Sequence, residues 1–175
     1  MVKKIMLIGL TTLIVIALSA CSSGNRVSDG GSTAGAKSAP DFTLTDLDGK
    51  THSLKDYAGQ KVYVKFWASW CSICLAGLEE VNTLAKEDKD FVVLTIVAPG
   101  YKNEKDTEAF KKWFNGVEEA PDLTVLLDEG GKIADQFQVR GYPTSAYIDA
   151  SGQLIQTLPG HVGNEQIIEK FATIE

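Results

Sequence analysis

The chain has 175 residues, of which 44% are apolar, a size and composition that suit one globular domain with an additional segment. Its formal net charge is −6. Because a domain that holds nucleic acid by bulk electrostatics normally carries a basic excess, this acidic balance excludes that class of partner.

The first 20 residues have the pattern of a secretion signal peptide. Lys3 and Lys4 give a positive start, and the apolar run from Ile5 to Ala17 is shorter than the ~20 residues that span a bilayer. The next letters, "LSAC", resemble the bacterial lipobox, which implies that Cys21 is lipidated and holds the protein on the extracytoplasmic face of the cell membrane. The alternative is an uncleaved anchor in which Cys21 has no role.

The segment at residues 21–39 is small and polar without apolar periodicity, so we predict a flexible tether before a folded domain at 40–175. The chain contains three cysteines, and lipidation of Cys21 would leave Cys71 and Cys74 as a pair. A cysteine pair that faces an oxidising compartment can persist as a disulfide.

The predicted elements of the domain build an α/β fold with a mixed sheet. Strand, helix and strand near the centre give a parallel βαβ unit with a right-handed crossover, and a hairpin and a helix close the domain. The turn pair Asp48-Gly49 predicts an N-terminal β-hairpin. We predict this hairpin at 41–54, strands at 61–67, 91–97, 123–128, 145–149 and 153–158, and helices at 71–87, 104–114, 132–138 and 164–172, the last capped by Asn164.

The two cysteines of "WCSIC" follow a predicted strand and open a predicted helix. Side chains at positions i and i+3 of a helix lie on one face, within reach of a disulfide. Cys71 lies at the helix start, where backbone amides and the helix dipole stabilise a thiolate, the form that attacks disulfides. Cys74 lies one turn further in. The pattern predicts a redox catalyst with Cys71 as the nucleophile and Cys74 as the resolving thiol.

Two other interpretations of the pair are a local structural disulfide and half of a metal site. A disulfide that closes so short a loop stabilises a fold little, because the gain grows with loop length. A structural zinc site needs four ligands, and the sequence holds no second cysteine pair. His52 and His161 are the only histidines, neither has ligand spacing to the pair, and we predict both to be surface residues. We therefore expect neither a metal nor another cofactor.

The motif "FWASWCSIC", followed further along the chain by "RGYPTSAYID", resembles the thioredoxin family over nearly the whole domain. The resemblance implies a thioredoxin fold, a redox-active disulfide between Cys71 and Cys74, and a cis proline at Pro143. In the family this proline exposes the backbone of the preceding residue to an extended substrate. Trp70, Tyr142 and Pro143 are therefore expected to form the substrate groove.

The opening hairpin and the inserted helix at 104–114 resemble the TlpA-like, membrane-anchored branch of that family. "WCSICLAGLEE" and "LLDEGGKIADQFQVRGYPTSAYID" are similar to extracellular thioredoxins that reduce methionine sulfoxide reductases and are fed by CcdA-type membrane proteins. The resemblance implies two partners: an oxidised protein client, such as methionine sulfoxide reductase, and a CcdA-type membrane thiol reductant. We expect the protein to be a monomer.

Two acidic residues of the family are missing from their usual places. Lys65 stands where cytosolic thioredoxin has a buried Asp, and Gly77 stands where cytochrome-maturation members have a Glu. The nearby Glu79 and Glu80 are predicted to form a solvated helix face.

Strand alternation places Lys65 on one face with Tyr63 and Trp67, and by analogy with the family's Asp this face lies beneath the cysteines. One hypothesis is that the Lys65 ammonium tunes the site by stabilising the Cys74 thiolate, which would speed resolution. We adopt the simpler interpretation, in which the stem of Lys65 packs in the core while its head reaches water.

Ser72 and Ile73, which replace the Gly-Pro of cytosolic thioredoxin, add no charge between the cysteines, so we expect a reductant rather than a disulfide donor. Alternatives within the family are a cytochrome c maturation or a disulfide-forming oxidoreductase. A peroxiredoxin would need a proline and a threonine where this chain has Val64 and Ala68, which argues against that class. The non-enzyme alternative is a copper-delivery lipoprotein. Such a protein would have a wider cysteine spacing and a histidine near the cis proline, and this sequence has neither.

Overall fold

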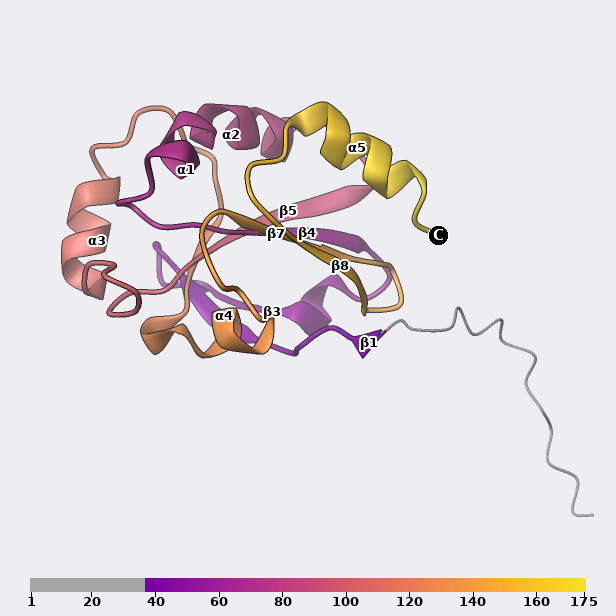
Figure 1. The fold of residues 1–175 in the computed structure, drawn as a ribbon, viewed down its shortest axis with the longest axis horizontal. Helices are drawn as coiled ribbons and strands as arrows, with labels where there is room; N and C mark the ends of the chain where they lie inside the picture. The colour runs from indigo at the N-terminus through magenta and orange to yellow at the C-terminus, as the bar shows by residue number, and fades with distance from the viewer. Residues whose placement is uncertain (1–36) are drawn as a thin grey trace, which may run out of the picture. The chain divides into compact units, whose positions relative to one another are not determined.

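The computed structural model describes residues 37–175, which form one mixed β-sheet with helices on both faces (Figure 1). The predicted signal peptide, Cys21 and the tether up to residue 36 lie outside the described residues. The strands are β1 (Lys37–Ser38), β2 (Thr43–Asp46), β3 (Thr51–Ser53), β4 (Lys61–Phe66), β5 (Phe91–Val97), β6 (Val125–Leu127), β7 (Thr144–Ile148) and β8 (Gln153–Pro159). The helices are α1 (Ser72–Ala76), α2 (Leu78–Lys86), α3 (Thr107–Phe114), α4 (Lys132–Gln136) and α5 (Asn164–Ala172), with short 3-10 helices at Leu54–Tyr57 and Glu129–Gly131.

The sheet has eight strands in the order β1-β8-β7-β4-β5-β6-β2-β3. Strands β4, β5 and β6 are parallel, whereas β7 runs antiparallel to both β4 and β8. The predicted mixed sheet and its parallel βαβ unit are therefore confirmed. The predicted N-terminal hairpin is also present: β2 and β3 pair antiparallel, and Asp46 accepts hydrogen bonds from the amides of Asp48 and Lys50 across their turn.

Alternation along β4 sends its side chains into two separate cores. Tyr63 pairs in one core with Trp67, which follows β4, and this core also contains both cysteines and the apolar sides of α2, α3 and α5. Val64 and Phe66 face the opposite core, which α4 covers. Figure 1 shows the two layers, with α1, α2 and α5 on one side of the sheet and α4 on the other. The cysteine pair thus belongs to the layer of α1, α2 and α5.

The helix predicted at 71–87 is interrupted at Gly77, where α1 ends and α2 begins. Gly77 has φ −102° and ψ 7°, outside the α-helical range. A Cβ at this position would stand 2.8 Å from Cε1 of His161, so any side chain here would displace the histidine ring. The apolar periodicity of the sequence continues across the break, and for that reason it predicted one helix.

The starts of α3 and α5 also differ from the prediction. Helix α3 begins at Thr107 rather than at 104, because the Asp106 side chain caps it by accepting the amide of the third helical residue at 2.8 Å. The N-cap of α5 is Gly163 rather than Asn164. The Asn164 side chain instead donates a hydrogen bond to the main-chain carbonyl of Glu80 at 2.7 Å, which ties α5 to α2.

Two further predictions are wrong near the edges of the sheet. Lys37 and Ser38, which we assigned to the tether, form β1 and pair antiparallel with β8. His52, which we predicted at the surface, is only 8% exposed. Its Nε2 donates to the Asp46 carboxylate at 2.8 Å, and its Nδ1 is hydrogen-bonded to the Tyr57 hydroxyl at 2.7 Å. This network fixes the hairpin to the 3-10 helix that follows it.

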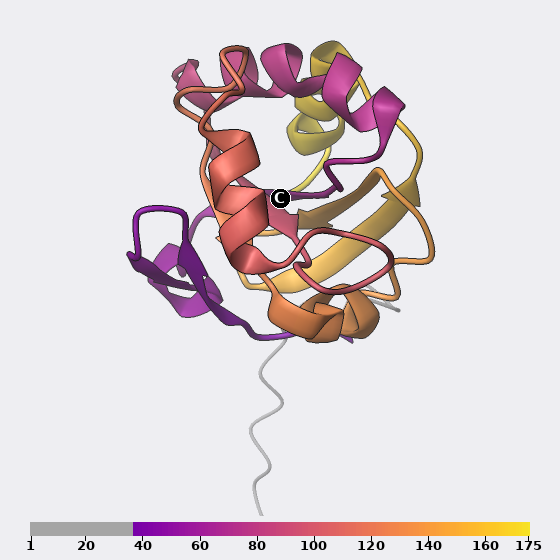
Figure 2. The same ribbon diagram turned by 90° about the vertical axis from the view of Figure 1, so that its left-hand side faces the viewer.

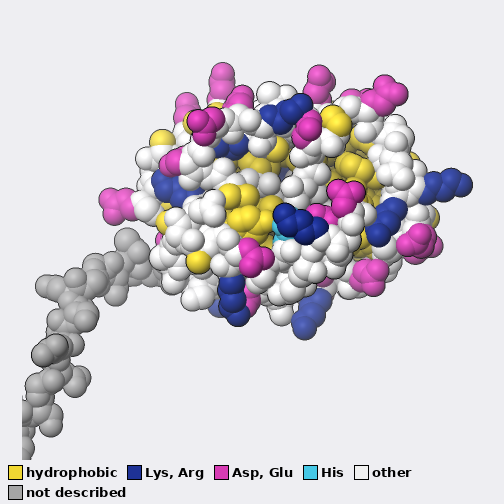
Figure 3. Space-filling view, turned by 180° about the vertical axis from the view of Figure 1, so that it is seen from behind, with side chains coloured by type: hydrophobic (Ala, Val, Ile, Leu, Met, Phe, Trp, Pro, Cys, Tyr) yellow, Lys and Arg dark blue, Asp and Glu magenta, His cyan; other side chains and the backbone are white. Residues whose placement is uncertain are grey.

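The surface of the domain carries both signs of charge. Figure 3 shows Lys, Arg, Asp and Glu side chains interspersed over one face, with apolar side chains between them. Two of the large apolar side chains that are exposed, Trp70 and Ile73, flank Cys71 in the sequence. No helix within residues 37–175 combines the length and the apolar character that crossing a membrane requires.

Candidate active site

Cys71 and Cys74 form a disulfide where the chain leaves β4 and enters α1. Their Cα atoms are 5.2 Å apart. Cys71 is the N-cap of α1, and its Sγ accepts a hydrogen bond from the Cys74 amide at 3.3 Å. Cys71 is 5% exposed, whereas Cys74 is completely buried. A thiol or disulfide of another protein can therefore reach only the Cys71 sulfur without a rearrangement.

Aromatic side chains border the exposed side of the disulfide. Trp70 and Ile73 are each about half exposed, and the Trp70 ring packs edge-on against Tyr142 with the ring centroids 5.9 Å apart. The Tyr142–Pro143 peptide bond is cis. Strand β7 begins directly after it and pairs with β4, the strand from which the cysteine loop emerges. The structure thus brings together the residues predicted for the substrate groove.

Tyr142, the residue that packs against Trp70, is partly buried. Burial raises the pKa of Tyr142 to about 12, so its hydroxyl is neutral at physiological pH. Lys102 lies over the Tyr142 ring, with its Nζ 5.8 Å from the ring centroid. The same Nζ donates a hydrogen bond to the carbonyl of Val139 at 2.7 Å, which joins the loop before α3 to the segment before β7.

A buried carboxylate on the loop before α3 fixes the segment that carries Trp70 and Cys71. Glu104 is 7% exposed, and its two oxygens accept hydrogen bonds from the Ser69 amide at 2.5 Å and the Ser69 hydroxyl at 2.6 Å. The Lys105 ammonium donates to the same hydroxyl at 2.7 Å. Figure 2 shows α3 and the loop that precedes it turned toward the viewer. The inserted loop therefore supports the cysteine segment from one side.

The sequence analysis missed Glu104 because it placed this residue in the first turn of a helix at 104–114. One local signal could have corrected the boundary: Asp106 is a favourable N-cap, which starts the helix at Thr107 and leaves Glu104 in a loop. Its partner could not have been found in this way, because nothing in the sequence pattern links Glu104 to Ser69, 35 positions earlier.

Lys65 contradicts the interpretation that we adopted from the sequence. Its side chain is 1% exposed, and its Nζ is buried without a hydrogen-bond partner among the described residues. The ammonium does not reach water, because Tyr63 and Trp67 on the same face are themselves completely buried. Burial lowers the pKa of Lys65 to about 8, and the negative charge of Glu80 opposes this shift.

The Lys65 ammonium lies beneath the break between α1 and α2. Its Nζ is 3.7 Å from the point where a Cβ on Gly77 would stand, and Nδ1 of the exposed His161 is 3.0 Å from the same point. His161 Nε2 lies 3.4 Å from one carboxylate oxygen of Glu80, and the other oxygen accepts a hydrogen bond from the first amide of α5 at 2.8 Å. Glu79 is exposed as predicted, whereas Glu80, whose side chain is 39% exposed, is also held by its contacts with His161 and α5.

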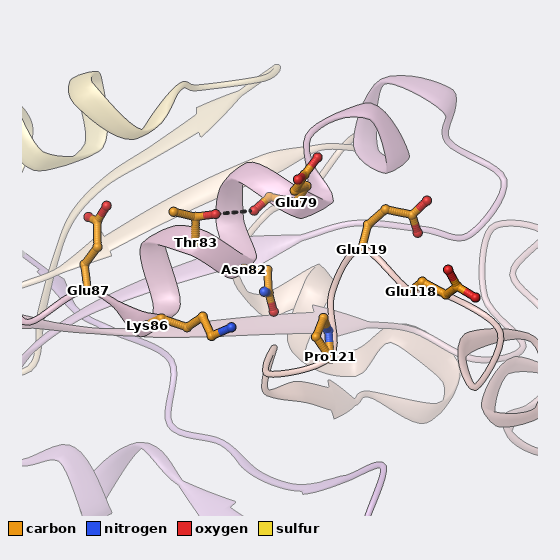
Figure 4. Close-up of a pocket in the computed structure, with 8 residues that line it drawn as sticks. All are labelled: Glu79, Asn82, Thr83, Lys86, Glu87, Glu118, Glu119 and Pro121. Atoms are coloured by element: carbon orange, nitrogen blue, oxygen red, sulfur yellow. Dashed lines mark hydrogen bonds between the residues drawn. The ribbon is translucent and has the colours of Figure 1, made fainter.

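A cleft of about 440 Å³ opens beside α2 and is separate from the cysteine site (Figure 4). Neither cysteine and none of the groove residues line it. Within residues 37–175, no three His, Cys, Asp or Glu side chains are grouped so that they could hold a metal ion. The residues that line the cleft are Glu79, Asn82, Thr83, Lys86, Glu87, Glu118, Glu119 and Pro121.

Comparison with protein families matches residues 33–170 to the Redoxin family. The chain belongs to the Redoxin family. It is 33% identical to the thiol-disulfide oxidoreductase ResA of Bacillus thuringiensis over 138 residues, which covers 79% of this chain and 77% of that protein. It is 51% identical to an uncharacterized protein of Haemophilus influenzae over 128 residues, which covers 73% of this chain and 81% of that protein.

Solved structures show the same relationship. The pneumococcal exposed lipoprotein thioredoxin Etrx1 from Streptococcus pneumoniae is 47% identical with a TM-score of 0.74, over 77% of this chain and 100% of that chain. The N-terminal domain of PilB from Neisseria gonorrhoeae is 28% identical with a TM-score of 0.68, over 74% of this chain and 87% of that chain. The chain thus has a thioredoxin-like fold and is a thiol–disulfide oxidoreductase of the ResA and TlpA type, whose redox-active disulfide joins Cys71 and Cys74.

Proposed function

We propose that this protein is a lipid-anchored reductant on the extracytoplasmic face of the cell membrane. It takes electrons from a CcdA-type membrane thiol protein and passes them to an oxidised protein client, for which methionine sulfoxide reductase is the expected identity. The observation that carries the proposal is the uncharged mouth of the disulfide. Trp70, Ser72 and Ile73, the exposed residues around Cys71 in the sequence, carry no charge, and within residues 37–175 the hydrogen bond to the Cys71 sulfur comes from the Cys74 amide and not from a cation.

The two cysteines take different roles in this scheme. The Cys71 thiolate of the reduced protein attacks a client disulfide, which forms a mixed disulfide and releases one client thiolate. The Cys74 thiolate then attacks the Cys71 sulfur, which closes the Cys71–Cys74 disulfide and releases the second client thiolate. Two electrons thus pass to the client. The exposure of Cys71 and the burial of Cys74 favour this order.

The groove supplies the docking site for the client. Trp70, next to Cys71 in the chain, packs against Tyr142, which precedes the cis Pro143, and these apolar side chains suit an extended segment of the client that carries its disulfide. The same side chains serve the CcdA-type protein, because a donor of electrons must also present a thiol to the Cys71 sulfur.

The direction of electron flow follows from what stabilises the Cys71 thiolate. A strong oxidant stabilises its thiolate heavily, whereas here Ser72 and Ile73 contribute no charge and are exposed to water. Each ~30 mV of potential corresponds to about 1.4 kcal/mol, so a missing cationic partner worth about 2–4 kcal/mol shifts the potential by roughly 40–90 mV toward reducing values. This shift places the expected potential below that of DsbA, ~ −120 mV, in the direction of thioredoxin, ~ −270 mV.

The lipid anchor at Cys21 lies outside the described residues, and two observations support it. The pattern of residues 1–21 is that of a lipoprotein signal. The similar pneumococcal protein is described as an exposed lipoprotein. We expect radioactive palmitate to label the wild-type protein in cells and to leave Cys21→Ala unlabelled. Equal labelling of the two proteins would contradict the anchor.

Trapping of the mixed disulfide in cells tests the proposed electron transfer. Cys74→Ser keeps the attacking thiol and removes the resolving one, so client and donor stay attached to Cys71 and can be identified by mass spectrometry after non-reducing electrophoresis. Cys71→Ser/Cys74→Ser is the matched control. We expect adducts that contain an oxidised envelope enzyme and a CcdA-type membrane protein. Adducts that contain only newly exported proteins acquiring their first disulfides would make this protein a disulfide donor.

A further inference from the structure

The disulfide form leaves one charged group of the core without a partner. The Lys65 side chain is 1% exposed, and its Nζ makes no hydrogen bond to any described residue. A buried donor without an acceptor destabilises a fold, and a charged one does so more strongly. Because buried polar groups are normally paired, we expect this ammonium to have an acceptor in another state of the protein.

The Lys65 ammonium lies under the segment that carries Cys74. Lys65 shares a face of the strand with Tyr63 and with Trp67, and both of these pack in the core that contains the two cysteines. Its Nζ is 3.7 Å from the Cβ position of Gly77, one helical turn beyond Cys74. The Gly77 amide donates to the carbonyl of Cys74 at 3.2 Å, so Cys74 and Gly77 belong to one helical turn. The lysine head lies beside the end of that turn.

We propose that Lys65 is the counter-ion of the Cys74 thiolate, so that its charge gains a partner only when the disulfide is open. In resolution, the Cys74 thiol gives its proton to solvent and its thiolate attacks the Cys71 sulfur. The bond between Cys71 and the client sulfur breaks, and the client sulfur leaves with the electron pair as a thiolate. The inference rests on the thiol–disulfide exchange of the proposed function, but not on its direction, its client or the lipid anchor.

The other titratable groups near Lys65 are either engaged with other partners or neutral, which leaves the Cys74 thiolate as its counter-ion. Glu80 is the carboxylate whose charge acts on Lys65, yet it is already engaged by His161 and by the first amide of α5. Burial lowers the pKa of Lys65 to about 8, so the ammonium is the main form at pH 7. Glu80 from α2 acts on Lys65 by its charge, and His161 from the loop before α5 lies with Lys65 Nζ beside Gly77. The other titratable groups in the core on this side of the sheet are Cys71, Cys74, Tyr63 and Tyr147, and burial raises the pKa of both tyrosines. Both tyrosines are therefore neutral at pH 7.

The expected size of the effect is about tenfold. A nearby opposite charge lowers the ionisation midpoint of an acidic group by about 1–3 pH units. A more acidic thiol is also a weaker nucleophile, with a Brønsted coefficient of about 0.4–0.5, so roughly half of the gain in thiolate survives in the rate. The net acceleration of resolution at pH 7 is therefore about tenfold, and it fades once the pH is high enough to ionise Cys74 without help.

The test follows the reaction of the reduced Cys21→Ala protein in detergent, whose two thiols are Cys71 and Cys74, with 5,5′-dithiobis(2-nitrobenzoate). In stopped flow, the first thionitrobenzoate reports attack by Cys71 and the second reports resolution by Cys74. The variant is Lys65→Met, an apolar side chain of similar length. The matched control is Lys61→Met at the start of the same strand, where the ammonium already pairs with Asp90 at 3.1 Å.

We expect Lys65→Met to slow the second phase about tenfold at pH 7, to leave the first phase within about twofold, and to approach the wild-type rate by about pH 9.5. Lys61→Met should leave both phases unchanged. An unchanged second phase in Lys65→Met at pH 7 would overturn the proposal. Slowing by the same factor at every pH would also overturn it, because a merely structural defect has no reason to depend on the ionisation of Cys74.

A second measurement tests the proposal without relying on the kinetics of resolution. In the Cys21→Ala/Cys71→Ser background, Cys74 is the one remaining thiol, so the thiolate absorbance near 240 nm follows its ionisation. We expect the titration midpoint of Cys74 to rise by about one pH unit or more when Lys65→Met or Lys65→Gln is added. Equal midpoints with and without the lysine would refute the counter-ion role, whatever the direction of electron flow in the cell.

Discussion

Glu104 accepts hydrogen bonds from both the amide and the hydroxyl of Ser69, a residue 35 positions earlier in the chain. Both residues are buried. The contact joins the inserted loop before α3 to the segment that carries Trp70 and Cys71, so the insertion acts as a support for the redox site. Without the Glu104 carboxylate, the Ser69 amide would lose its acceptor in a place that water does not reach.

We expect Glu104→Ala to lower the free energy of unfolding of the oxidised protein by about 2 kcal/mol, because a buried donor left unpaired costs about 1–3 kcal/mol. The variant should also react more slowly at Cys71 when reduced, since the cysteine segment loses a fixed position. Urea unfolding and the rate of alkylation by iodoacetamide measure the two effects. Glu108→Ala on the exposed side of α3 is the control, and wild-type values for Glu104→Ala in both assays would contradict the supporting role.

The two thiols should differ in reactivity. Cys71 caps α1, receives the Cys74 amide and is the more exposed, so its thiolate is both stabilised and accessible. A brief pulse of iodoacetamide on the reduced protein near neutral pH should label Cys71 before Cys74, as peptide mapping would show. Labelling that favours Cys74 would overturn the assignment of the nucleophile.

The stability of the oxidised protein should depend on Lys65 in a pH window between about 8 and 10.5. Burial lowers the pKa of Lys65 to about 8 in the folded chain, below its ordinary value of 10.5, so the unfolded chain binds more protons in this window and stability rises with pH. Lys65→Met should remove this rise and should stabilise the oxidised protein at pH 7 by about 3 kcal/mol, at 1.36 kcal/mol for each pKa unit. Urea unfolding of both proteins at pH 7 and pH 9.5 gives the difference, in which the other titrating groups cancel. A wild-type protein as stable as the variant at both pH values would contradict the burial of an unpaired ammonium.

Trp70 should matter more for a protein client than for a small disulfide. The ring is half exposed and packs edge-on against Tyr142, so Trp70→Ala removes a contact surface without opening the core. We expect insulin reduction to slow several-fold, while the reaction with 5,5′-dithiobis(2-nitrobenzoate) stays near the wild-type rate. Ile168→Ala, which removes an exposed apolar side chain from α5, is the control. Equal insulin reduction by wild type and Trp70→Ala would remove this residue from the groove.

Features that depend on residues close in the sequence could be predicted. The alternation of "KVYVKFW" assigned Tyr63 and Trp67 to one core and Val64 to the other, because side chains of a strand alternate whatever packs on them. The Asp48-Gly49 pair located the hairpin, because Gly49 adopts a φ of 86° that favours glycine. The spacing of Cys71 and Cys74 predicted the disulfide, because side chains at positions i and i+3 of a helix lie on one face.

Features that depend on distant residues could not be predicted. Whether the Lys65 head reaches water is decided by Tyr63, Trp67 and the turn at Gly77 together, and not by the strand that carries it. The break at Gly77 reflects the approach of His161, which lies on a loop far along the chain. Glu80 looked solvated on its own helix, but α5 packs beside it. In each case tertiary packing determines a property that the local sequence pattern does not indicate.

The reduction potential of the Cys71–Cys74 pair tests the central claim most directly. The full-length protein in detergent is equilibrated with glutathione buffers of known ratio, and the fraction of disulfide is read after acid quenching and alkylation. A reductant whose Cys71 thiolate lacks a cationic partner should give a potential at least about 40 mV more negative than that of DsbA, in the direction of thioredoxin, ~ −270 mV. A value near that of the strong periplasmic oxidants, ~ −120 mV, would contradict the account and make this protein a donor of disulfides.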